Sequence, residues 1–474
     1  MDELKIYFNG AWRRTKKSFP VFNPYSGEEI AQVHETDEES FLSAISGAKA
    51  GVGEINSLPV YERAEILSKA SSLLQERGEE FAQAITKEAG KAIKYSRGEV
   101  GRAIENFRFA SEVIKHLKGS VLKGDAGKGG VGRTLFYERF PLGVIAAITP
   151  FNFPLNLAVH KLAPAFATGN SVIFKPSSYT PVTAVKLVQL LLDSGYPKNA
   201  INLVTGPGDL IGRWINNAPE IRMITFTGSP EVGKTIKSQS GLKKVSLELG
   251  SNSPVIIEDV SNMERLIPRL ITGICANSGQ VCISLQRIYC NEKIYDELRD
   301  SLISAVKKVP VGDPSDENVE YGPMITEKEA IRIENWVKTA VKKGAKVLAG
   351  GTRYKSIIQP TIIENVNSEM EVYSREVFGP VACLIKYDSF EEVLDEVNLS
   401  EFGLNAGVFT CDINKAMKAY KKLETGAVII NDIPTWRVDH MPYGGVKGSG
   451  IGREGTEFAM EEMTEIKLMV IKQE

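Results

Sequence analysis

Cys282 is the residue whose type and setting best suit covalent chemistry. It ends the segment SGQVC (278–282), where a Ser-Gly-Gln turn predicts exposed, irregular backbone just after the end of a helix. A cysteine with a free backbone N–H can attack a carbonyl carbon and help to hold the oxyanion that forms. Such a nucleophile still needs a base and a second donor from elsewhere in the chain. The remaining cysteines lack this setting, and we expect them to be small buried hydrophobic residues: Cys275, Cys290, Cys383 and Cys411.

The cysteines do not predict a metal site. Six residues separate Cys275 from Cys282, and seven separate Cys282 from Cys290, which is not the ligand spacing of a zinc site. None of the histidines lies near these cysteines in the sequence, so a Cys/His dyad has no support either. The histidines of the chain are His34, His116, His160 and His440.

Two glycine-rich loops could cradle a phosphate. The segment GSPEVGKT (228–235) matches the phosphate-loop pattern of NTPases at every defined position. The apolar run from Val255 to Asp259, which ends in an acidic residue, resembles the metal-binding strand of these enzymes. An NTPase is therefore an alternative from another class. It is disfavoured because the motif follows the fourth strand of a series and no water-positioning residue accompanies it. The second loop is GPGDLIG (206–212), and a nucleotide lying across both loops would meet free N–H groups at helix N-termini.

The elements that would position these residues alternate between strand and helix. Short apolar runs separated by helical segments predict a parallel sheet covered on both faces, with ligands beyond the carboxyl ends of its strands. After residue 250 the alternation restarts, which predicts a second α/β domain. The first series of apolar runs lies at 144–149, 171–175, 201–205, 223–227 and 245–249.

Two segments depart from this alternation. Residues 118–140 are rich in glycine with β-prone ends, which predicts a protruding hairpin, either a flexible surface loop or an oligomerisation arm. Residues 141–159 carry no charge and are long enough to suggest a membrane span. Their three prolines and two asparagines favour a buried strand, a sharp loop and a helix instead.

Composition and charge indicate an ordinary globular protein. The 474 residues suggest two to four domains. The formal net charge of −2 predicts neither a basic surface for binding nucleic acid nor a polybasic segment for binding a membrane. Five cysteines fit a reducing cytosol, and no secretory signal is visible at the start. We therefore expect a cytoplasmic protein without nucleic-acid or membrane partners.

Seven motifs in order along the chain carry a resemblance to a known family. They are FNFP (151–154), KPS (175–177), FTGS (226–229), LELG (247–250), SGQVC (278–282), EVFGPV (376–381) and PYGGVKGSGIGRE (442–454). Together they resemble the aldehyde dehydrogenase superfamily over essentially the whole chain, and its non-CoA-acylating lactaldehyde and glyceraldehyde dehydrogenase branch in particular. In this family the FTGS turn faces a dinucleotide rather than ATP.

The resemblance implies an α/β fold of three parts. A Rossmann-like cofactor domain with a parallel sheet would comprise residues 1–117 and 141–247. A second α/β catalytic domain would comprise residues 248–446. Residues 118–140 and 447–474 would form a β-arm oligomerisation element with the C-terminal segment. Because family members assemble through such an arm, we expect a homo-oligomer, a tetramer or a dimer.

The resemblance also implies the catalytic residues. Cys282 would attack an aldehyde to give a thiohemiacetal, whose oxyanion the Cys282 N–H and the Asn152 side chain would hold. Loss of hydride would leave a thioester, and Glu248 would activate the water that hydrolyses it to a free acid. The sequence departs from the family at Ser251, where a second glycine is usual after ELG; a larger side chain there could shift the loop behind Glu248.

For the cofactor, the resemblance implies contacts with both ends of a nicotinamide dinucleotide. Ser178 stands where NAD-preferring members often carry a glutamate that repels a 2′-phosphate, and Lys175 could pair with that phosphate. We therefore predict NADP, with NAD possible. The predicted cofactor-binding residues are Thr149, Pro150, Phe151, Lys175, Ser177, Ser178, Gly206, Gly208, Phe226, Thr227, Gly228, Ser229, Val232, Leu249, Glu376 and Phe378.

The substrate prediction is a small hydroxyaldehyde of the glyceraldehyde or lactaldehyde type. The apolar Val281 disfavours a phosphosugar, because members that act on one tend to carry arginine there. Succinic semialdehyde, whose carboxylate would pair with Arg437, is one alternative, and non-phosphorylating oxidation of glyceraldehyde-3-phosphate is another. The predicted substrate-side residues are Asn152, Phe153, Asn156, Trp436, Arg437 and His440.

Overall fold

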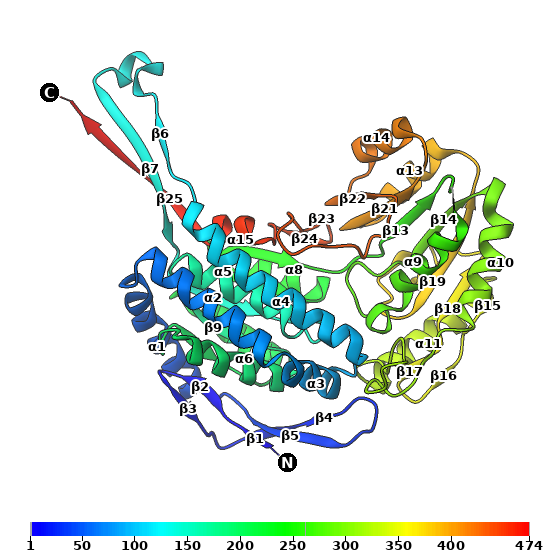
Figure 1. Cartoon of the computed structure of the whole chain (residues 1–474), viewed down its shortest axis with the longest axis horizontal. Helices are drawn as coiled ribbons and strands as arrows, with labels where there is room; N and C mark the ends of the chain where they lie inside the picture. The colour runs from blue at the N-terminus through cyan, green and yellow to red at the C-terminus, as the bar shows by residue number, and fades with distance from the viewer. Residues whose placement is uncertain (1, 261, 474) are drawn as a thin grey trace.

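The computed structural model describes residues 2–260 and 262–473. Two α/β bodies lie side by side, and a long β-arm projects from the first of them (Figure 1). Each body has its own sheet, and both sheets contain parallel strands. The predicted α/β class with a Rossmann-like domain, a second α/β domain and a β-arm is therefore confirmed.

The first body is built on an eight-stranded sheet. Its inner strands are parallel and correspond to the five apolar runs of the sequence, whereas the three flanking pairings are antiparallel. In spatial order the strands are β24 (Gly450–Ile451), β12 (Lys244–Glu248), β11 (Ile221–Thr227), β8 (Val144–Ile148), β9 (Ser171–Lys175), β10 (Ile201–Leu203), β2 (Ile6–Phe8) and β3 (Ala11–Arg13).

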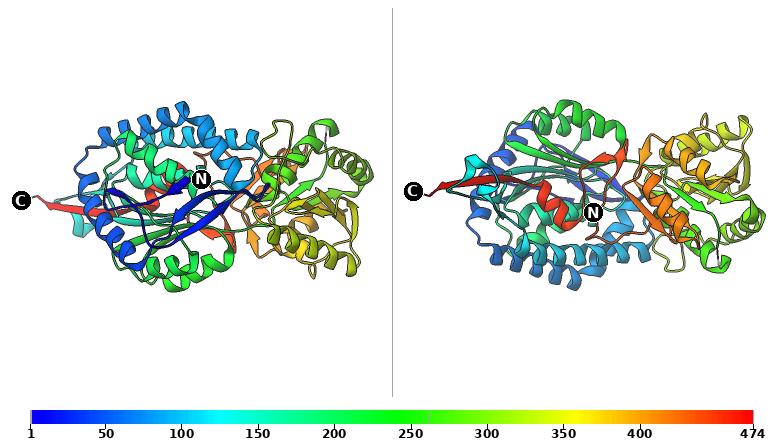
Figure 2. Two further views of the ribbon diagram at one scale, coloured as in Figure 1. Left: turned by 90° about the horizontal axis from the view of Figure 1, so that it is seen from below. Right: turned by 90° about the horizontal axis from the view of Figure 1, so that it is seen from above.

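Helices cover both faces of this sheet, as the two further views show (Figure 2). Along β8, Ile145 and Ala147 pack into one core while Val144 and Ala146 pack into the other. This alternation follows from the two-residue period of a strand. The first core includes α2 (Val60–Glu76), α3 (Gly78–Ala89), α4 (Ile93–Val113), α5 (Asn156–Ala167) and α6 (Pro181–Ser194). The second includes α1 (Glu38–Asn56), α7 (Gly208–Asn217) and α8 (Pro230–Gln239).

The second body is built on a seven-stranded sheet that is parallel except for its first pairing. Its strands in spatial order are β15 (Lys346–Ala349), β18 (Thr361–Glu364), β19 (Val381–Tyr387), β14 (Arg287–Asn291), β13 (Pro254–Ile257), β21 (Asn405–Phe409) and β22 (Ala427–Ile430). Its helices are α9 (Met263–Cys275), α10 (Tyr295–Val306), α11 (Glu327–Lys342), α12 (Glu371–Ser374), α13 (Phe390–Asn398) and α14 (Ile413–Lys422).

The glycine-rich segment 118–140 forms part of a three-stranded antiparallel arm. It contributes β6 (Ser120–Leu122) and β7 (Arg133–Pro141), and the C-terminal strand β25 (Thr464–Lys472) pairs along the whole of β7. The rest of the C-terminal segment lies elsewhere, because β24 pairs with β12 and α15 (Thr456–Glu462) packs on α5. Among the described residues 447–473, β25 and the adjoining Gln473, which bonds to Gly132 and Thr134, thus belong to the arm.

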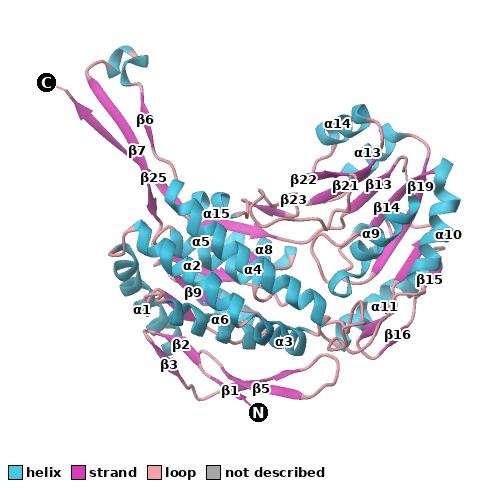
Figure 3. Cartoon of the chain, in the orientation of Figure 1, coloured by secondary structure: helices cyan, strands magenta, loops and turns pink. Residues whose placement is uncertain are grey.

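Smaller strands complete the secondary structure (Figure 3). The segment Asn9-Gly10 turns β2 into β3, with φ angles of 48° and 74° that suit a tight hairpin. No helix in the described part of the chain is long and apolar enough to cross a membrane. The remaining strands are β1 (Asp2–Leu4), β4 (Ser18–Phe22), β5 (Glu29–His34), β16 (Arg353–Tyr354), β17 (Ile357–Ile358), β20 (Phe402–Gly403) and β23 (Val446–Lys447).

Candidate active site

A strained turn carries Cys282 into the space between the two bodies. After α9 ends, Asn277, Ser278 and Gly279 take consecutive φ angles of 51°, 58° and 69°, a conformation that is costly for the two residues with side chains. The Ser278 hydroxyl donates to the carbonyl of Gly322 at 3.1 Å, which helps to hold the turn. A Cβ at Gly279 would lie 2.2 Å from the carbonyl carbon of Gly379, so only glycine fits there. Cys282 itself is half-buried rather than exposed as expected.

Asn152 is tied to the same segment. It follows β8 in the loop before α5, and its Nδ2 donates to the Gln280 carbonyl at 2.9 Å. In return, Asn277 Nδ2 donates to the Asn152 carbonyl at 3.1 Å. An amide nitrogen carries two hydrogens, so one remains for a ligand beside Cys282. The buried carboxylate of Glu99 fixes the start of α5 by accepting the N–H groups of Leu155 and Asn156.

Glu248 ends β12 in a buried position. Neither carboxyl oxygen has a hydrogen-bond partner within the described residues. Burial, and next the charge of Glu454, raise the pKa of Glu248 well above its usual value, whereas Lys161 and Arg437 oppose that rise. The hydroxyl of Ser251 lies 3.0 Å from the hydroxyl of Ser253. A carboxyl group held in this way can take up a proton in the neutral range.

Two cavities meet at Cys282, which lines both. Cavity 1, of about 450 Å³, also contains Asn152 and Glu248. It brings together half of the residues predicted to bind the cofactor, namely Pro150, Phe151, Thr227, Gly228, Ser229, Leu249, Glu376 and Phe378. Phe378 has a φ of 52°, and its ring packs edge-on against Phe151 with centroids 5.9 Å apart.

Another group of predicted cofactor residues lies together at the ends of β9 and β10. The Ser178 hydroxyl donates to the Gly206 carbonyl at 2.9 Å, and a Cβ at Gly208 would lie 3.9 Å from Lys175 Nζ. Burial lowers the pKa of Lys175 to about 8. The predicted residues that line neither cavity are Thr149, Lys175, Ser177, Ser178, Gly206, Gly208, Phe226 and Val232.

Cavity 1 fits one end of a dinucleotide. The hydroxyl of Thr227, which lines the cavity, is buried without a hydrogen-bond partner in the described residues, so it is left for a ligand. Ser229 caps α8 by accepting the Val232 N–H at 3.4 Å. Glu376 accepts the Ser251 N–H at 3.0 Å through one oxygen, and burial raises its pKa to about 8.

The glycines of the phosphate-loop pattern (228–235) are explained by close packing rather than by phosphate binding. A Cβ at Gly228 would lie 2.4 Å from the Phe226 ring, and one at Gly233 would lie 2.4 Å from Leu249. Both glycines therefore allow close packing. The lysine of the pattern, Lys234, is 66% exposed and lies 4.0 Å from Glu401 rather than over the loop.

Cavity 2, of about 340 Å³, lies on the other side of Cys282. The predicted substrate-side residues Phe153, Asn156, Trp436 and Arg437 line it, whereas Asn152 lines cavity 1. His440 lines neither cavity; it is exposed and packs against Phe109, with ring centroids 4.9 Å apart.

Sequence reasoning missed most of the polar residues of cavity 2, which include Glu99 and three others that bear on the substrate. Arg102 from α4, Arg269 from α9 and Tyr443 all line it. Arg102 makes two hydrogen bonds to Asp439, at 3.0 and 2.6 Å. Only Tyr443 lies within a recognised motif, and nothing in the local sequence around the two arginines marks them. The cavity is therefore more cationic than the sequence indicated.

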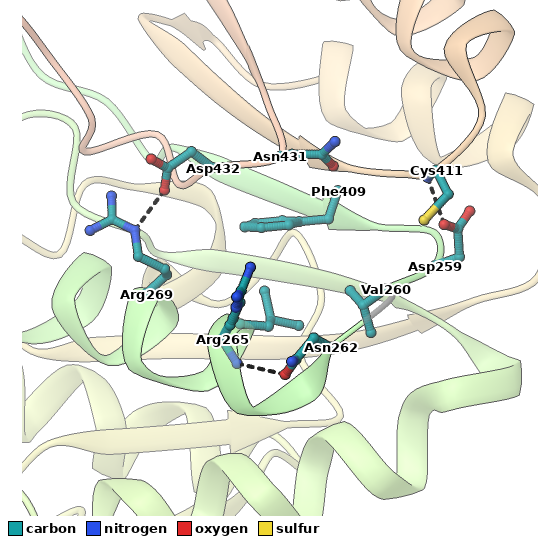
Figure 4. Close-up of a pocket in the computed structure, with 10 residues that line it drawn as sticks. Asp259, Val260, Asn262, Arg265, Arg269, Phe409, Cys411, Asn431 and Asp432 are labelled. Carbon is teal, nitrogen blue, oxygen red and sulfur yellow. Dashed lines mark hydrogen bonds and ion pairs between the residues drawn. The ribbon is translucent and has the colours of Figure 1, made fainter.

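A further cavity of about 370 Å³ lies at the carboxyl ends of β13, β21 and β22 (Figure 4). Arg269 lines this cavity as well as cavity 2, and its Nε donates to Asp432 at 2.7 Å. Two arginines and two aspartates line it, so its charges balance: Arg265, Arg269, Asp259 and Asp432. None of the residues predicted from the sequence belongs to it.

Solved structures define the class of protein. Aldehyde dehydrogenase 21 from Physcomitrella patens, in complex with the reaction product succinate, superimposes with a TM-score of 0.97 at 39% identity, covering 100% of this chain and 98% of that one. Glyceraldehyde-3-phosphate dehydrogenase GapN from Methanocaldococcus jannaschii, complexed with NADP, gives a TM-score of 0.93 at 38% identity, covering 97% and 100%. The fold is therefore that of an oxidoreductase, and the predicted NADP or NAD cofactor agrees with the NADP held by GapN.

Sequence relatives give the same result. Residues 12–469 match the model of the Aldehyde dehydrogenase family. A 3-sulfolactaldehyde dehydrogenase from Priestia aryabhattai is 44% identical over 99% of this chain and 98% of its own length. A lactaldehyde dehydrogenase from Methanococcus maripaludis is 39% identical over 98% and 99%. This chain belongs to the aldehyde dehydrogenase family, so the resemblance predicted from the motifs is confirmed and the NTPase alternative is wrong.

Proposed function

We propose that this enzyme oxidises a small 2-hydroxyaldehyde to the free carboxylic acid, with a preference for NADP. The observation that carries the proposal is the position of Cys282 where two cavities meet, one with Glu248 and Asn152 and the other with polar substrate-side residues. The relatives named for lactaldehyde and 3-sulfolactaldehyde support a hydroxyaldehyde.

The proposed reaction forms and breaks one C–S bond. The Cys282 thiolate attacks the aldehyde carbon, and the carbonyl electron pair moves to oxygen, where the free hydrogen of Asn152 Nδ2 stabilises it. A nicotinamide dinucleotide in cavity 1 supplies the hydride acceptor. Once the aldehyde hydrogen has left with its electron pair, the carbonyl re-forms as a thioester on Cys282.

Hydrolysis then releases the acid. Glu248 takes a proton from water as the water attacks the thioester carbon, and the C–S bond breaks to return the thiolate. Burial raises the pKa of Glu248 above that of an exposed carboxyl, so this carboxylate is a stronger base toward water than an exposed one. Water is the only acceptor of the acyl group that these steps require.

A specific observation favours an anionic group on the substrate. In cavity 2, Arg437 Nε and Thr435 Oγ1 are buried without a hydrogen-bond partner in the described residues. Arg102 and Arg269 line the same space. A sulfonate or carboxylate would satisfy these donors, since guanidinium groups bind such oxygens well. We therefore propose an anionic 2-hydroxyaldehyde as the second candidate.

A substrate panel distinguishes these candidates. We expect lactaldehyde and glyceraldehyde to be oxidised with NADP, measured as the appearance of NADPH. If the arginines hold an anion, 3-sulfolactaldehyde should have a kcat/KM at least about tenfold higher than lactaldehyde. Faster turnover of succinic semialdehyde, which lacks the hydroxyl, than of every hydroxyaldehyde would contradict the proposed substrate class.

The NADP preference is proposed to depend on Ser178. Replacing it with glutamate, Ser178→Glu, puts a carboxylate beside the 2′-phosphate, and like charges in contact repel strongly. We expect the ratio of kcat/KM for NADP to that for NAD to fall at least about tenfold. Ser178→Gln is the matched control, because it adds the same bulk as glutamate without its charge. An unchanged ratio in both variants would show that the 2′-phosphate binds elsewhere.

The arm is proposed to join copies of this chain into a dimer or tetramer. Ile466, Leu468, Met469, Val470 and Ile471 on β25 are each about half exposed. Such a contiguous apolar surface is unusual on a monomer. Within the described residues β22 lies at the edge of its sheet, which leaves a row of backbone groups for another strand.

A further inference from the structure

The hydroxyl of Tyr443 contacts the reactive sulfur. Tyr443 Oη lies 3.0 Å from Cys282 Sγ, and the residues are 161 positions apart in the sequence. The tyrosine is 3% exposed, and both residues line cavity 2. The contact is thus built by the fold at the point where the substrate would react.

When Cys282 is ionised, the tyrosine is the donor in this pair, because a thiolate has no proton to give. Burial raises the pKa of Tyr443 well above its usual value, and the charge of Cys282 raises it further. The phenol therefore keeps its proton. Burial also raises the pKa of the Cys282 thiol, to about 12, whereas the hydrogen bond from Tyr443 lowers it. A thiolate that has lost its hydration shell gains most from such a donor.

Arg437 strengthens this donor. Its guanidinium carbon lies 3.6 Å from the centroid of the Tyr443 ring, and its Nη2 donates to Glu454 at 3.1 Å. A cation over an aromatic face attracts its π electrons, which makes the phenolic O–H more acidic. Arg437 and Tyr443 therefore act together on the Cys282 sulfur.

We propose that Tyr443 is a further catalytic residue, whose hydroxyl donates a hydrogen bond to the Cys282 thiolate. The donor stabilises the nucleophile before its electron pair forms the C–S bond. It stabilises the same thiolate again when the thioester is hydrolysed and that bond breaks. This inference rests on the proposed function, because it requires Cys282 to be the nucleophile.

Other charged groups face Cys282 as well. Arg437 favours the thiolate by its charge, while Glu376 and Glu248 disfavour it when they are ionised. Within residues 2–260 and 262–473, Tyr443 is the group that makes a hydrogen bond to Sγ. Loss of its hydroxyl should therefore shift the thiol titration upward even though the other groups stay in place.

The test measures the thiol itself. The rate of iodoacetamide alkylation at Cys282, quantified on its peptide by mass spectrometry from pH 6 to 10, reports the thiolate fraction. In Tyr443→Phe we expect the profile to move to higher pH, and the rate at pH 7 to fall about tenfold. We expect kcat/KM to fall with it. The control Tyr321→Phe, which loses a buried hydroxyl bonded to the Ile358 carbonyl, should keep the wild-type profile.

A second variant tests the opposite direction. With 3-fluorotyrosine at position 443, the more acidic phenol should move the Cys282 profile to lower pH, and its near-native shape avoids a folding defect. Unchanged profiles in both variants would overturn the role of Tyr443. If Cys282→Ala keeps its activity, the nucleophile assignment fails instead, which is a separate result because alkylation does not depend on turnover.

Discussion

Cys282→Ala is expected to abolish aldehyde oxidation while NADP still binds. Alanine cannot form the C–S bond, so kcat should fall by at least about 10⁴-fold, as when a covalent nucleophile is removed from other enzymes. NADP binding should persist because the cofactor contacts come from other residues of cavity 1. The measurements are NADPH formation with a hydroxyaldehyde and the quenching of intrinsic fluorescence by NADP.

Cys411→Ala is the matched control. Cys411 is exposed, not buried as the sequence predicted, and it lines neither cavity 1 nor cavity 2, so its loss should leave oxidation unchanged. Retained activity in Cys282→Ala would show that the nucleophile is another residue, and loss of both activity and NADP binding would point to a misfolded variant rather than to lost chemistry.

Glu248→Gln is expected to stop the enzyme after hydride transfer. Glutamine fills the same buried site but cannot take a proton from water. Steady-state turnover should therefore fall about 10²–10⁴-fold, the usual contribution of a general base. Because the earlier steps do not need this base, a rapid mix should still produce one equivalent of NADPH per active site. Stopped-flow absorbance of NADPH measures both phases.

The absence of a burst of NADPH in Glu248→Gln would place the action of Glu248 earlier in the reaction. If Glu248→Gln produces NADPH slowly and without a fast phase, then Glu248 acts before the thioester forms. Lys234→Ala serves as the control, because Lys234 is exposed and outside both cavities. It should show wild-type turnover.

The sequence predicted the scaffold because its patterns are local. Alternating apolar runs and helical segments follow from the periods of strands and helices, and the five parallel strands of the first sheet lie where those runs do. The SGQVC segment also showed that Cys282 follows a helix, since α9 ends at Cys275. The left-handed φ angles of Asn277 and Ser278 were not predictable, because tertiary contacts impose them.

The polar lining of cavity 2 depends on contacts between distant residues. Arg102 meets Asp439 across 337 positions of the sequence, and Tyr443 meets Cys282 across 161. No local pattern marks such pairs. The same limit explains His440, which follows Arg437 closely in the sequence but packs against Phe109 and does not line cavity 2.

The most direct test of the account locates the covalent intermediate. Glu248→Gln is mixed with lactaldehyde and NADP, quenched in acid and digested, and the peptide that contains Cys282 is weighed by mass spectrometry. The account predicts a lactyl group, joined as a thioester, on Cys282 of most molecules. An unmodified Cys282 together with a full equivalent of NADPH, or an acyl group on any other residue, would contradict it.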